Sequence, residues 1–519
     1  MLEKQPYYGP GDLRTVFLCV DENALTHDIT ELIRVLAGHC EVCPIEAGQV
    51  MELSAEQALL TLRHKEGALE AQFESRARQK ALSRPLPTQA LPDPVQQKRR
   101  KRWSYKQAAY QVMRPFFRTY TPWGSLTGIR PSKLFRQMAA QHGAEGARAM
   151  FASQFDVSEE KMNLLTAIAQ RQAGILEGVS PEDYDLYIGI PFCRTRCNYC
   201  SFAASALEKE GKPIRRMEQL VPAYLDTLHE EIRANVGAFV RMGKRLRSIY
   251  IGGGTPTAIQ PRQLQALIQT TLKVAGGHGK EFTVEAGRPD SIDKDMLSML
   301  KTMGVTRISI NPQSMNNTTL QRIGRAHSAE DIGRAYALAR SMGFDHINMD
   351  IILGLEGETL QDVEHTLAWM ERFGPDSLTV HALALKRASK LREELLGQEE
   401  AGRKQRQMAV EEQAAQMQQA AAHAAARMGL TPYYMYRQKY SAGNLENTAY
   451  ARPGAASLYN VDIMEEEVSI LALGAGAISK RVGNGQLERL ANPRDIQTYM
   501  AAVATKTAER IALWQGQRP

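Results

Sequence analysis

The chain has 519 residues, which leaves room for about two to four domains of ordinary size. Its 43% hydrophobic and 23% charged residues are typical of a globular protein and exclude a coiled coil or a disordered chain. The net charge of +7 is modest for this length and is only weak evidence for nucleic-acid binding. No apolar stretch reaches the roughly 18 residues that a membrane span needs, and the first residues contain no apolar signal core. We therefore expect a cytoplasmic protein.

The N-terminal part of the chain is expected to contain three regions. Residues 13–62 alternate short apolar runs with helical segments, which predicts a small α/β domain over residues 1–83. Residues 84–102 are rich in proline and end in the basic run Lys98–Arg102, a composition typical of a linker. Residues 103–180 show helical patterns that are interrupted by the turn-rich segment TPWGSLTGIRPSK.

The middle of the chain alternates strands with helices. The six strand-like segments are DLYIGI (185–190), SIYIGG (248–253), EFTVEA (281–286), RISINP (307–312), HINMDIIL (346–353) and SLTVHALA (377–384). This alternation predicts an α/β fold of parallel βα units that close partly or wholly into a barrel over residues 181–390. In such barrels the chemistry lies at the carboxyl ends of the strands. Residues 391–519 are expected to form a long helix, ended by Gly429, and a mixed α/β appendage that covers the substrate and is not part of the barrel.

The six cysteines are too few for a disulfide scaffold. Three near the N-terminus have no metal-binding context and are expected to be structural: Cys19, Cys40 and Cys43. The others, Cys193, Cys197 and Cys200, form a C-x3-C-x2-C pattern just after the first strand-like segment. Three thiolates on a short loop can bind three irons of a [4Fe–4S] cluster and leave the fourth iron open. A zinc site or three buried thiols are the alternatives.

With these motifs the sequence resembles the radical S-adenosylmethionine (SAM) superfamily over residues 186–385, and within it the oxygen-independent coproporphyrinogen III oxidase group. The motifs that carry the likeness are LYIGIPFCRTRCNYCSF, YIGGGTPT, VEAGRPD, RISINPQS, GRAHS and NMDIILGL. Outside the barrel, TPWGSLTGIRPSK and YRQKYSAGNLENTAYARPG resemble the HemZ branch of that group. The resemblance implies a partial (β/α)6 barrel, a [4Fe–4S] cluster and one or two molecules of SAM.

Two further motifs lie at the expected ends of the second and third strands. The segment Gly252–Thr257 directly follows a strand, and its glycines let a ligand approach the backbone, although a tight βα turn is the alternative. Glu285 ends the next strand. A carboxylate there can hold the amino group or ribose of SAM, and a salt bridge at the rim is the alternative.

The resemblance also implies roles for individual residues. It implies that the catalytic residues are Cys193, Cys197, Cys200 and Tyr187. It implies that SAM is contacted by Tyr187, Tyr199, Gly253, Gly254, Thr255 and Glu285. The positions that match a second SAM site are Gln313, Arg325 and Asp350. Asp350 is the least ordinary of these, because an acid inside an apolar strand must be paired or face a polar cavity.

The implied reaction is the oxidative decarboxylation of coproporphyrinogen III. A 5′-deoxyadenosyl radical from SAM removes hydrogen from the β-carbon of a propionate, and loss of CO2 and one electron leaves a vinyl group. Two such events give protoporphyrinogen IX. Candidates for holding this four-carboxylate substrate are Arg288, Arg325, Arg437 and Lys439. We expect an electron donor such as flavodoxin or ferredoxin, and a monomer.

Two positions depart from the authentic oxidases, which carry His in place of Gly189 and Cys in place of Phe202. These departures keep two alternatives open: a haem- or tetrapyrrole-binding radical SAM protein, and an RNA-modifying radical enzyme that uses the basic run. That run is otherwise expected to be a solvated linker. The Gly-x-Gly fragment in Leu473–Ala477 is interpreted as close packing. His327 and His381 show no metal-ligand spacing, and His327 is expected to be a hydrogen-bonding loop residue.

Overall fold

The computed structural model describes most of the chain, which divides into two compact units. The described residues are 8, 12–38, 40–49, 52–76, 78–85, 94–119, 121–384, 400–438, 441, 444–483 and 486–516. Unit 1 comprises Met1–Thr166 and Glu399–Ala409, and unit 2 comprises Ala167–Gln398 and Val410–Pro519. No helix in these described ranges is both long and apolar enough to cross a membrane.

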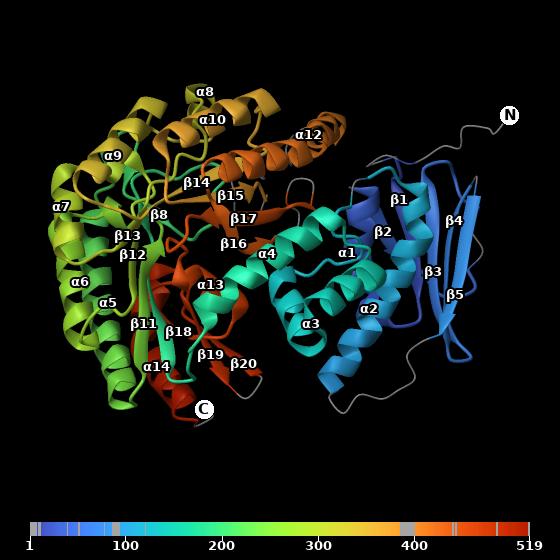
Figure 1. Cartoon of the computed structure of the whole chain (residues 1–519), viewed down its shortest axis with the longest axis horizontal. Helices are drawn as coiled ribbons and strands as arrows, with labels where there is room; N and C mark the ends of the chain where they lie inside the picture. The colour runs from blue at the N-terminus through green and yellow to red at the C-terminus, as the bar shows by residue number, and fades with distance from the viewer. Residues whose placement is uncertain are drawn as a thin grey trace. The chain divides into compact units, whose positions relative to one another are not determined.

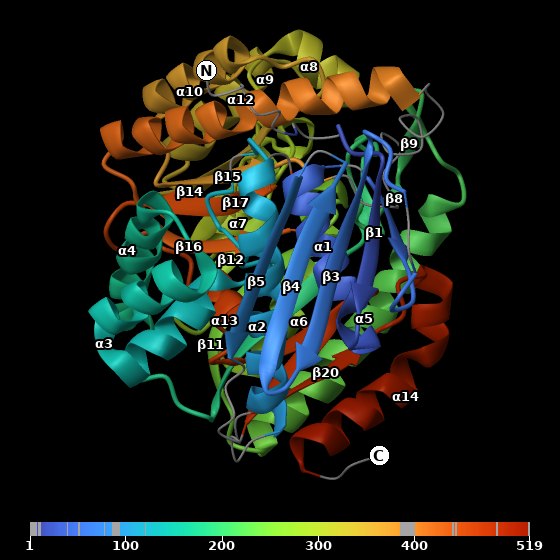
Figure 2. The same cartoon turned by 90° about the vertical axis from the view of Figure 1, so that its right-hand side faces the viewer.

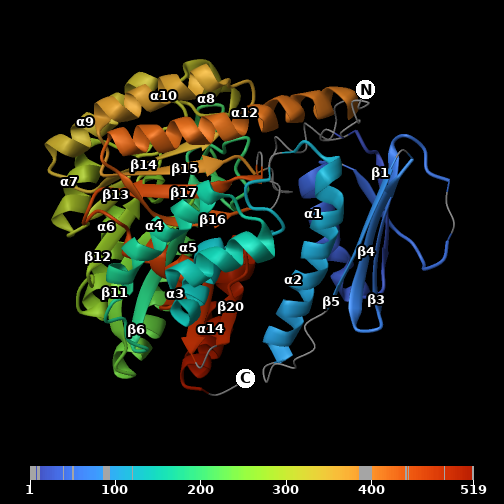
Figure 3. The same ribbon diagram turned by 45° about the vertical axis from the view of Figure 1, so that its right-hand side comes forward.

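Unit 1 contains a five-stranded sheet with helices on one face (Figures 2 and 3). The strands are, in spatial order, β2 (Glu41–Pro44), β1 (Thr15–Val20), β3 (Gln57–Lys65), β4 (Ala68–Ser75) and β5 (Arg78–Pro85). The helices are η1 (Asn23–Leu25), α1 (Thr26–Ala37), α2 (Pro94–Met113), η2 (Arg114–Phe116), α3 (Pro131–Phe155) and the first part of α4 (Glu159–Leu176). Leu60, Phe73 and Tyr105 are buried in one core that joins the sheet to α2. The α/β pattern expected for this region is confirmed.

The linker expected over residues 84–102 has regular structure at both of its ends. Strand β5 continues to Pro85, and α2 begins at Pro94, so the basic run is helical. Residues 86–93 lie outside the described residues. A proline is compatible with the first position of a helix, where its missing N–H would have no partner, and Gln, Lys and Arg are good helix formers. The division of the chain into five domains at the expected boundaries stays a prediction.

The basic run Lys98–Arg102 is partly neutralised inside unit 1. Lys101 forms an ion pair with Glu22. Arg102 forms another with Asp28, with 3.0 Å between nitrogen and oxygen. These pairs join α2 to η1 and α1, so part of the run contributes to packing within unit 1 and less of it is available to RNA.

Unit 2 is built on an 11-stranded sheet with helices over its outer face (Figure 1). Its centre consists of the six expected strands, all parallel: β6 (Asp183–Ile190), β11 (Arg245–Gly253), β12 (Glu281–Glu285), β13 (Arg307–Ser309), β14 (Ile347–Leu353) and β15 (Ser377–Ala382). The helices between them are α5 (Met217–Arg241), η3 (Pro256–Ala258), α6 (Pro261–Ala275), η4 (Pro289–Ser291), α7 (Lys294–Thr302), α8 (Asn317–Arg322), α9 (Ala329–Ser341) and α10 (Leu360–Phe373). The predicted α/β fold with a partial barrel is confirmed.

The C-terminal segment continues this sheet at both edges. Beyond β15 lie the antiparallel strands β17 (Glu446–Ala451) and β16 (Thr431–Arg437). Beyond β6 lie β18 (Ser469–Leu473), which is parallel to β6, and the antiparallel β19 (Ile478–Gly483) and β20 (Gln486–Ala491). Its helices are α12 (Glu400–Arg427), α13 (Leu458–Glu465) and α14 (Ile496–Trp514). The expectation of an appendage apart from the barrel was wrong here, because the apolar strand β18 is buried along its whole length within the sheet.

Local signals fix the ends of several of these helices. Ser328 and Thr359 begin α9 and α10, and each forms a capping box with the aspartate three residues later. Gly374 ends α10 with a φ of +60°, a left-handed conformation that suits glycine and turns the chain toward β15. Gly429, with a φ of +70°, follows the end of α12, as predicted.

Candidate functional site

The carboxyl ends of the parallel strands meet at one rim of the sheet in unit 2. Ile190 of β6 lies opposite Gly253 of β11, and Glu285 of β12 lies opposite Ser309 of β13. The cysteine loop therefore leaves β6 beside the glycine turn that leaves β11, and Glu285 ends the next strand. Parallel pairing brings the three motifs to one edge, which is where such folds carry out chemistry.

The cysteine loop begins with the short strand β7 (Phe192–Cys193), which pairs with β8 (Ser205–Ala206). Cys197 is buried, and Cys193 and Cys200 are half-buried. The amide of Cys200 donates to the carbonyl oxygen of Cys197 at 3.2 Å, so these two residues share one turn. Burial raises the pKa of the Cys193 thiol to about 11, and the nearby Cys200 and Cys197 thiols add to this rise. The three thiols are thus close enough to affect one another.

Two side chains donate hydrogen bonds to sulfur atoms of this loop. Thr255 Oγ1 lies 3.6 Å from Cys193 Sγ, and Arg288 Nη1 lies 3.8 Å from Cys197 Sγ. In the described ranges no three His, Cys, Asp or Glu side chains lie close enough to share a single metal ion. A cubane cluster needs no such convergence, because each thiolate binds a different iron. Three thiols with hydrogen-bond donors to sulfur fit a [4Fe–4S] cluster.

The glycine turn packs tightly against the start of the cysteine loop. A Cβ atom on Gly254 would lie 2.4 Å from the carbonyl oxygen of Phe192. The amides of Gly254 and Thr255 donate to the carbonyl oxygens of Ile190 and Phe192 at 2.8 and 2.7 Å. Gly253 has a φ of +113°, which few residues other than glycine adopt. The tight-turn interpretation therefore holds for this segment, because the backbone of Ile190 and Phe192 fills the space that side chains on Gly253 and Gly254 would need.

Glu285 is half-buried at the rim, and its carboxylate accepts a hydrogen bond from the Tyr250 hydroxyl at 2.6 Å. Separation from bulk water raises its pKa to about 7, and the negative charge of Asp350 contributes to the rise. No Lys or Arg in the described ranges forms an ion pair with Glu285, so the alternative of a rim salt bridge is not found there. A carboxylate in this state is able to accept a cationic ligand group.

Three tyrosine rings stack beside Glu285. The ring centroids of Tyr250 and Tyr459 are 4.4 Å apart, and that of Tyr187 lies 6.2 and 6.1 Å from them. The resemblance indicated Tyr187 but neither Tyr250 nor Tyr459. Tyr250 could have been found, because it lies two residues before Gly252 and so on the same face of its strand. Tyr459 carries no local signal, because α13 lies far away in the sequence.

The structure brings Gln313 and Asp350 together. The amide of Gln313 donates to the carbonyl oxygen of Asp350 at 2.9 Å, and Gln313 has a φ of +66°. The side chain of Gln313 is buried, and its Oε1 has no hydrogen-bond partner among the described residues. The Asp350 carboxylate accepts from Asn348 at 2.7 Å and lies 3.7 Å from His381 Nε2. Burial by itself would raise the pKa of Asp350, but His381 and the hydrogen bonds to the carboxylate hold this pKa below its ordinary value.

Arg325, the third position matched to a second SAM, contacts the cysteine loop. Its Nη2 donates to the Tyr199 hydroxyl at 3.4 Å, and its Nη1 donates to the carbonyl oxygen of Asn311. His327 is buried nearby, and burial together with the charge of Arg325 lowers the pKa of its ring to about 3. Neither ring nitrogen of His327 finds a hydrogen-bond partner in the described part of the chain. His327 was expected to be a hydrogen-bonding loop residue, but its buried ring forms no hydrogen bond with the described residues.

The basic residues expected to hold substrate carboxylates are engaged elsewhere. Arg288 binds both carboxylate oxygens of Asp290, at 3.0 and 2.9 Å. Arg325 is held as described above, and Arg437 donates to the carbonyl oxygen of Asn444 at 3.1 Å. Lys439 lies outside the described residues. Each of the three described guanidinium groups therefore already has a partner within the chain.

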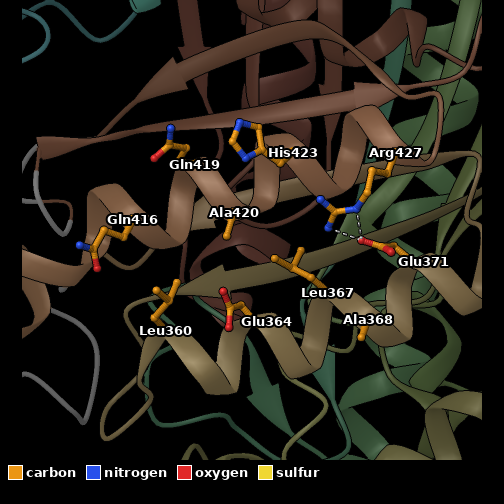
Figure 4. Close-up of a pocket in the computed structure, with 10 residues that line it drawn as sticks. All are labelled: Leu360, Glu364, Leu367, Ala368, Glu371, Gln416, Gln419, Ala420, His423 and Arg427. Atoms are coloured by element: carbon orange, nitrogen blue, oxygen red, sulfur yellow. Dashed lines mark hydrogen bonds and ion pairs between the residues drawn. The ribbon is translucent and has the colours of Figure 1, made fainter.

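A groove of about 500 Å³ lies apart from these residues, between α10 and α12 (Figure 4). It is lined by Leu360, Glu364, Leu367, Ala368, Glu371, Gln416, Gln419, Ala420, His423 and Arg427. An ion pair between Glu371 and Arg427, 2.6 Å long, crosses one end of it. None of the predicted site residues lines the groove.

Comparison with known proteins agrees with the motifs at the rim. Residues 187–370 match the family model of the radical SAM superfamily. The oxygen-independent coproporphyrinogen-III oxidase-like protein HemZ of Bacillus subtilis (strain 168) is 38% identical over 397 residues, or 75% of this chain and 76% of HemZ. The chain belongs to the HemZ family of radical SAM proteins. Membership of the radical SAM superfamily implies a [4Fe–4S] cluster and SAM.

Two further proteins resemble this chain over a smaller part of its length. The heme chaperone HemW of the same strain is 33% identical over 200 residues, which are 38% of this chain and 49% of HemW. The chain thus matches about half the length of HemW. The solved structure of the coproporphyrinogen III oxidase HemN from Escherichia coli has a TM-score of 0.47 and 22% identity, over 65% of this chain and 73% of HemN.

Proposed function

We propose that this chain is a radical SAM oxidoreductase that converts propionates of coproporphyrinogen III to vinyl groups without oxygen, giving protoporphyrinogen IX. The observation that carries the proposal is the extent of the likeness to HemZ, which covers 397 residues and so continues well beyond the superfamily domain at 187–370. HemZ is itself named as oxidase-like, and coproporphyrinogen is the substrate class in that name.

In this proposal Cys193, Cys197 and Cys200 hold a [4Fe–4S] cluster. Bound together, the cluster and SAM supply a 5′-deoxyadenosyl radical that can abstract hydrogen from an unactivated carbon. Thr255 and Arg288 support the loop by donating hydrogen bonds to two of its sulfur atoms. These donors favour the thiolate form that binds iron.

Glu285 and Tyr187 are proposed to contact SAM. The half-buried carboxylate of Glu285 accepts the ammonium group of SAM, and the stacked rings of Tyr187, Tyr250 and Tyr459 exclude water from that side. Gln313 offers an amide oxygen that has no partner among the described residues, and Asp350 offers an ionised carboxylate, to a further polar group. Arg325 orients Tyr199 beside the cysteine loop.

An anaerobic product assay tests the oxidase proposal. Reconstituted, reduced protein is mixed with SAM and coproporphyrinogen III, and 5′-deoxyadenosine, CO2 and protoporphyrinogen IX are measured. The proposal expects all three products to appear together. Cleavage of SAM with no porphyrin product would contradict it, and the protein would then be a radical SAM enzyme of another specificity.

A second candidate is a radical SAM protein that binds haem or another tetrapyrrole without turning it over. The match to HemW, a named heme chaperone, supports it, and so does Gly189 at the position where the oxidases carry His. This candidate expects a stoichiometric haem complex with a Soret band and no porphyrin product. A haem titration that shows no saturable Soret change counts against it.

A further inference from the structure

A hairpin stands directly beside the cysteine loop. It consists of β9 (Glu208–Lys209) and β10 (Lys212–Pro213), which are antiparallel and joined by a two-residue turn. The amides of Leu207 and Glu208 donate to the carbonyl oxygens of Cys193 and Arg194 at 2.8 and 2.9 Å. The hairpin is therefore held by backbone hydrogen bonds to the strand that carries the first cysteine.

This hairpin and the residues after it carry concentrated positive charge. Four basic side chains are exposed and form no ion pair with the described residues: Lys209, Lys212, Arg215 and Arg216. The nearby acids are Glu208, which pairs with Arg194 at 2.9 Å, Glu210 in the turn, and Glu218 in the first turn of α5, so basic side chains outnumber acids among the groups without an ion pair in the described residues. Lys209 and Lys212 lie directly opposite each other in the strand pair. Like charges in that position destabilise a hairpin, so folding alone does not favour this arrangement.

An exposed aromatic ring adds an apolar element to this surface. Phe202 is 66% exposed, and its backbone amide hydrogen-bonds to the thiol of Cys200. Phe202 lies three residues before β8, the strand that leads into the hairpin, so this exposed ring and the four basic side chains belong to one short segment beside the cysteine loop. We call the surface formed by Phe202, Lys209, Lys212, Arg215 and Arg216 the basic patch.

We infer that the basic patch is the docking surface of a small acidic one-electron carrier protein that reduces the cluster; this inference rests on the proposed function. The charge of the patch selects an acidic partner, and its bonds to the cysteine loop bring that partner next to the iron ligands. One electron leaves the carrier and enters the cluster, so the carrier is oxidised and the cluster reduced by one electron, and no atom is transferred. Basic charge steers such a partner to the surface, and complexes for electron transfer are small and transient.

A pair of matched charge reversals tests the docking surface in the reconstituted protein. The patch variant is K212E/R215E, and the control is K273E/K280E. Lys273, in the last turn of α6, and Lys280, just before β12, are exposed at the opposite ends of the strands. Reduced flavodoxin serves as the acidic carrier, and its Kd and the rate at which it bleaches the cluster absorbance are measured at low and high salt. Dithionite, a small reductant that needs no docking surface, provides the reference rate.

The patch variant is expected to bind flavodoxin about tenfold more weakly at low salt, to be reduced correspondingly slowly, and to lose most of its salt dependence. The control variant and all dithionite rates should equal those of the unchanged protein. Phe202→Ser should weaken binding while keeping the salt dependence, which separates apolar contact from electrostatic attraction.

Equal Kd and reduction rate in the patch variant and the unchanged protein would overturn the inference. RNA that binds the patch with steep salt dependence, while flavodoxin does not bind, would also overturn it and assign the surface to nucleic acid. A failure of the proposed function gives a different result. In that case flavodoxin still reduces the cluster through the patch, but neither reductant leads to cleavage of SAM with formation of porphyrin product.

Discussion

The two ends of strand β12 carry glutamates that the fold uses in different ways. Glu281, at the start, is buried and accepts hydrogen bonds from Ser457 Oγ and the Leu458 amide, both at 2.9 Å. Glu285, at the end, accepts one from Tyr250, and its pKa is raised to about 7. The first carboxylate caps α13 and holds it to the sheet. The second retains the capacity to bind a cation, so the partners of a buried acid, and not burial alone, distinguish a ligand site from a structural contact.

The largest effect is expected in the cysteine loop after β6, which holds the cluster in our proposal. Cys197→Ser should abolish the brown chromophore, the bound iron and all cleavage of SAM, because a [4Fe–4S] cluster depends on every thiolate. Iron content and visible absorbance after reconstitution measure the loss. Cys43→Ser, which changes a half-buried cysteine of unit 1, is the matched control and should behave like the unchanged protein. A Cys197→Ser protein that keeps both iron and chromophore would remove the cluster assignment.

The two glutamates are compared directly by the same substitution at each end. Glu285→Gln should weaken SAM binding by roughly 10- to 100-fold without lowering the free energy of unfolding, because it removes the charge that attracts the ammonium group but breaks no contact that holds the fold. Glu281→Gln should lower the free energy of unfolding by about 1 to 3 kcal/mol, since a buried donor near α13 loses its acceptor, while SAM affinity stays unchanged. Titration calorimetry and thermal unfolding measure the two quantities. If both variants lose stability and neither loses affinity, Glu285 is structural as well.

The six central strands and the cysteine loop could be predicted from sequence because their signals are local: apolar runs of strand length, glycines after them, and cysteines at fixed spacing. The pairing of β18 with β6 joins residues nearly 300 positions apart, and no local pattern reports it. For the same reason, no local pattern pointed to Tyr459 or to the hydrogen bonds between Glu281 and the start of α13. The start of α2 was missed for another reason, since the proline and charge that suggested a linker are also compatible with the first turn of a helix.

The pH dependence of stability and of SAM binding should also distinguish Glu285 from Glu281, at the other end of β12. In the folded protein without SAM, Glu285 has a pKa of about 7 against an ordinary value of 4.5, so the folded state keeps a proton that the unfolded state loses. Its contribution to stability therefore falls as the pH rises between those two values, and Glu285→Gln should remove that slope. SAM affinity should change in the opposite direction. SAM binding needs the ionised carboxylate, so the affinity for SAM should fall by up to about tenfold for each pH unit below the pKa of Glu285.

Thermal unfolding and SAM titration on both sides of neutrality check these slopes. Glu281→Gln is the control for the pH dependence of SAM binding, because Glu281 lies at the other end of the strand and should leave that dependence intact. A SAM affinity that is constant across this range would mean that Glu285 does not bind the ammonium group.

The smallest effect is expected at Gly189, where the authentic oxidases carry a side chain. A Cβ atom there would meet its nearest neighbours, the Leu473 carbonyl oxygen and the Tyr187 ring, at 3.4 Å, whereas on Gly254 it would meet the Phe192 carbonyl oxygen at 2.4 Å. Gly189→Ala should therefore change stability by less than about 1 kcal/mol, since the lower entropy of the unfolded chain offsets the tight contact. Gly254→Ala should cost about 1 to 3 kcal/mol, because backbone has to move. Denaturant unfolding compares the two variants. If Gly189→Ala is tolerated and still cleaves SAM, the rim has space for a side chain at this position. The glycine would then reflect what the site binds and not how the barrel packs. A loss as large as that of Gly254→Ala would instead make Gly189 a packing residue like the glycines of the neighbouring turn.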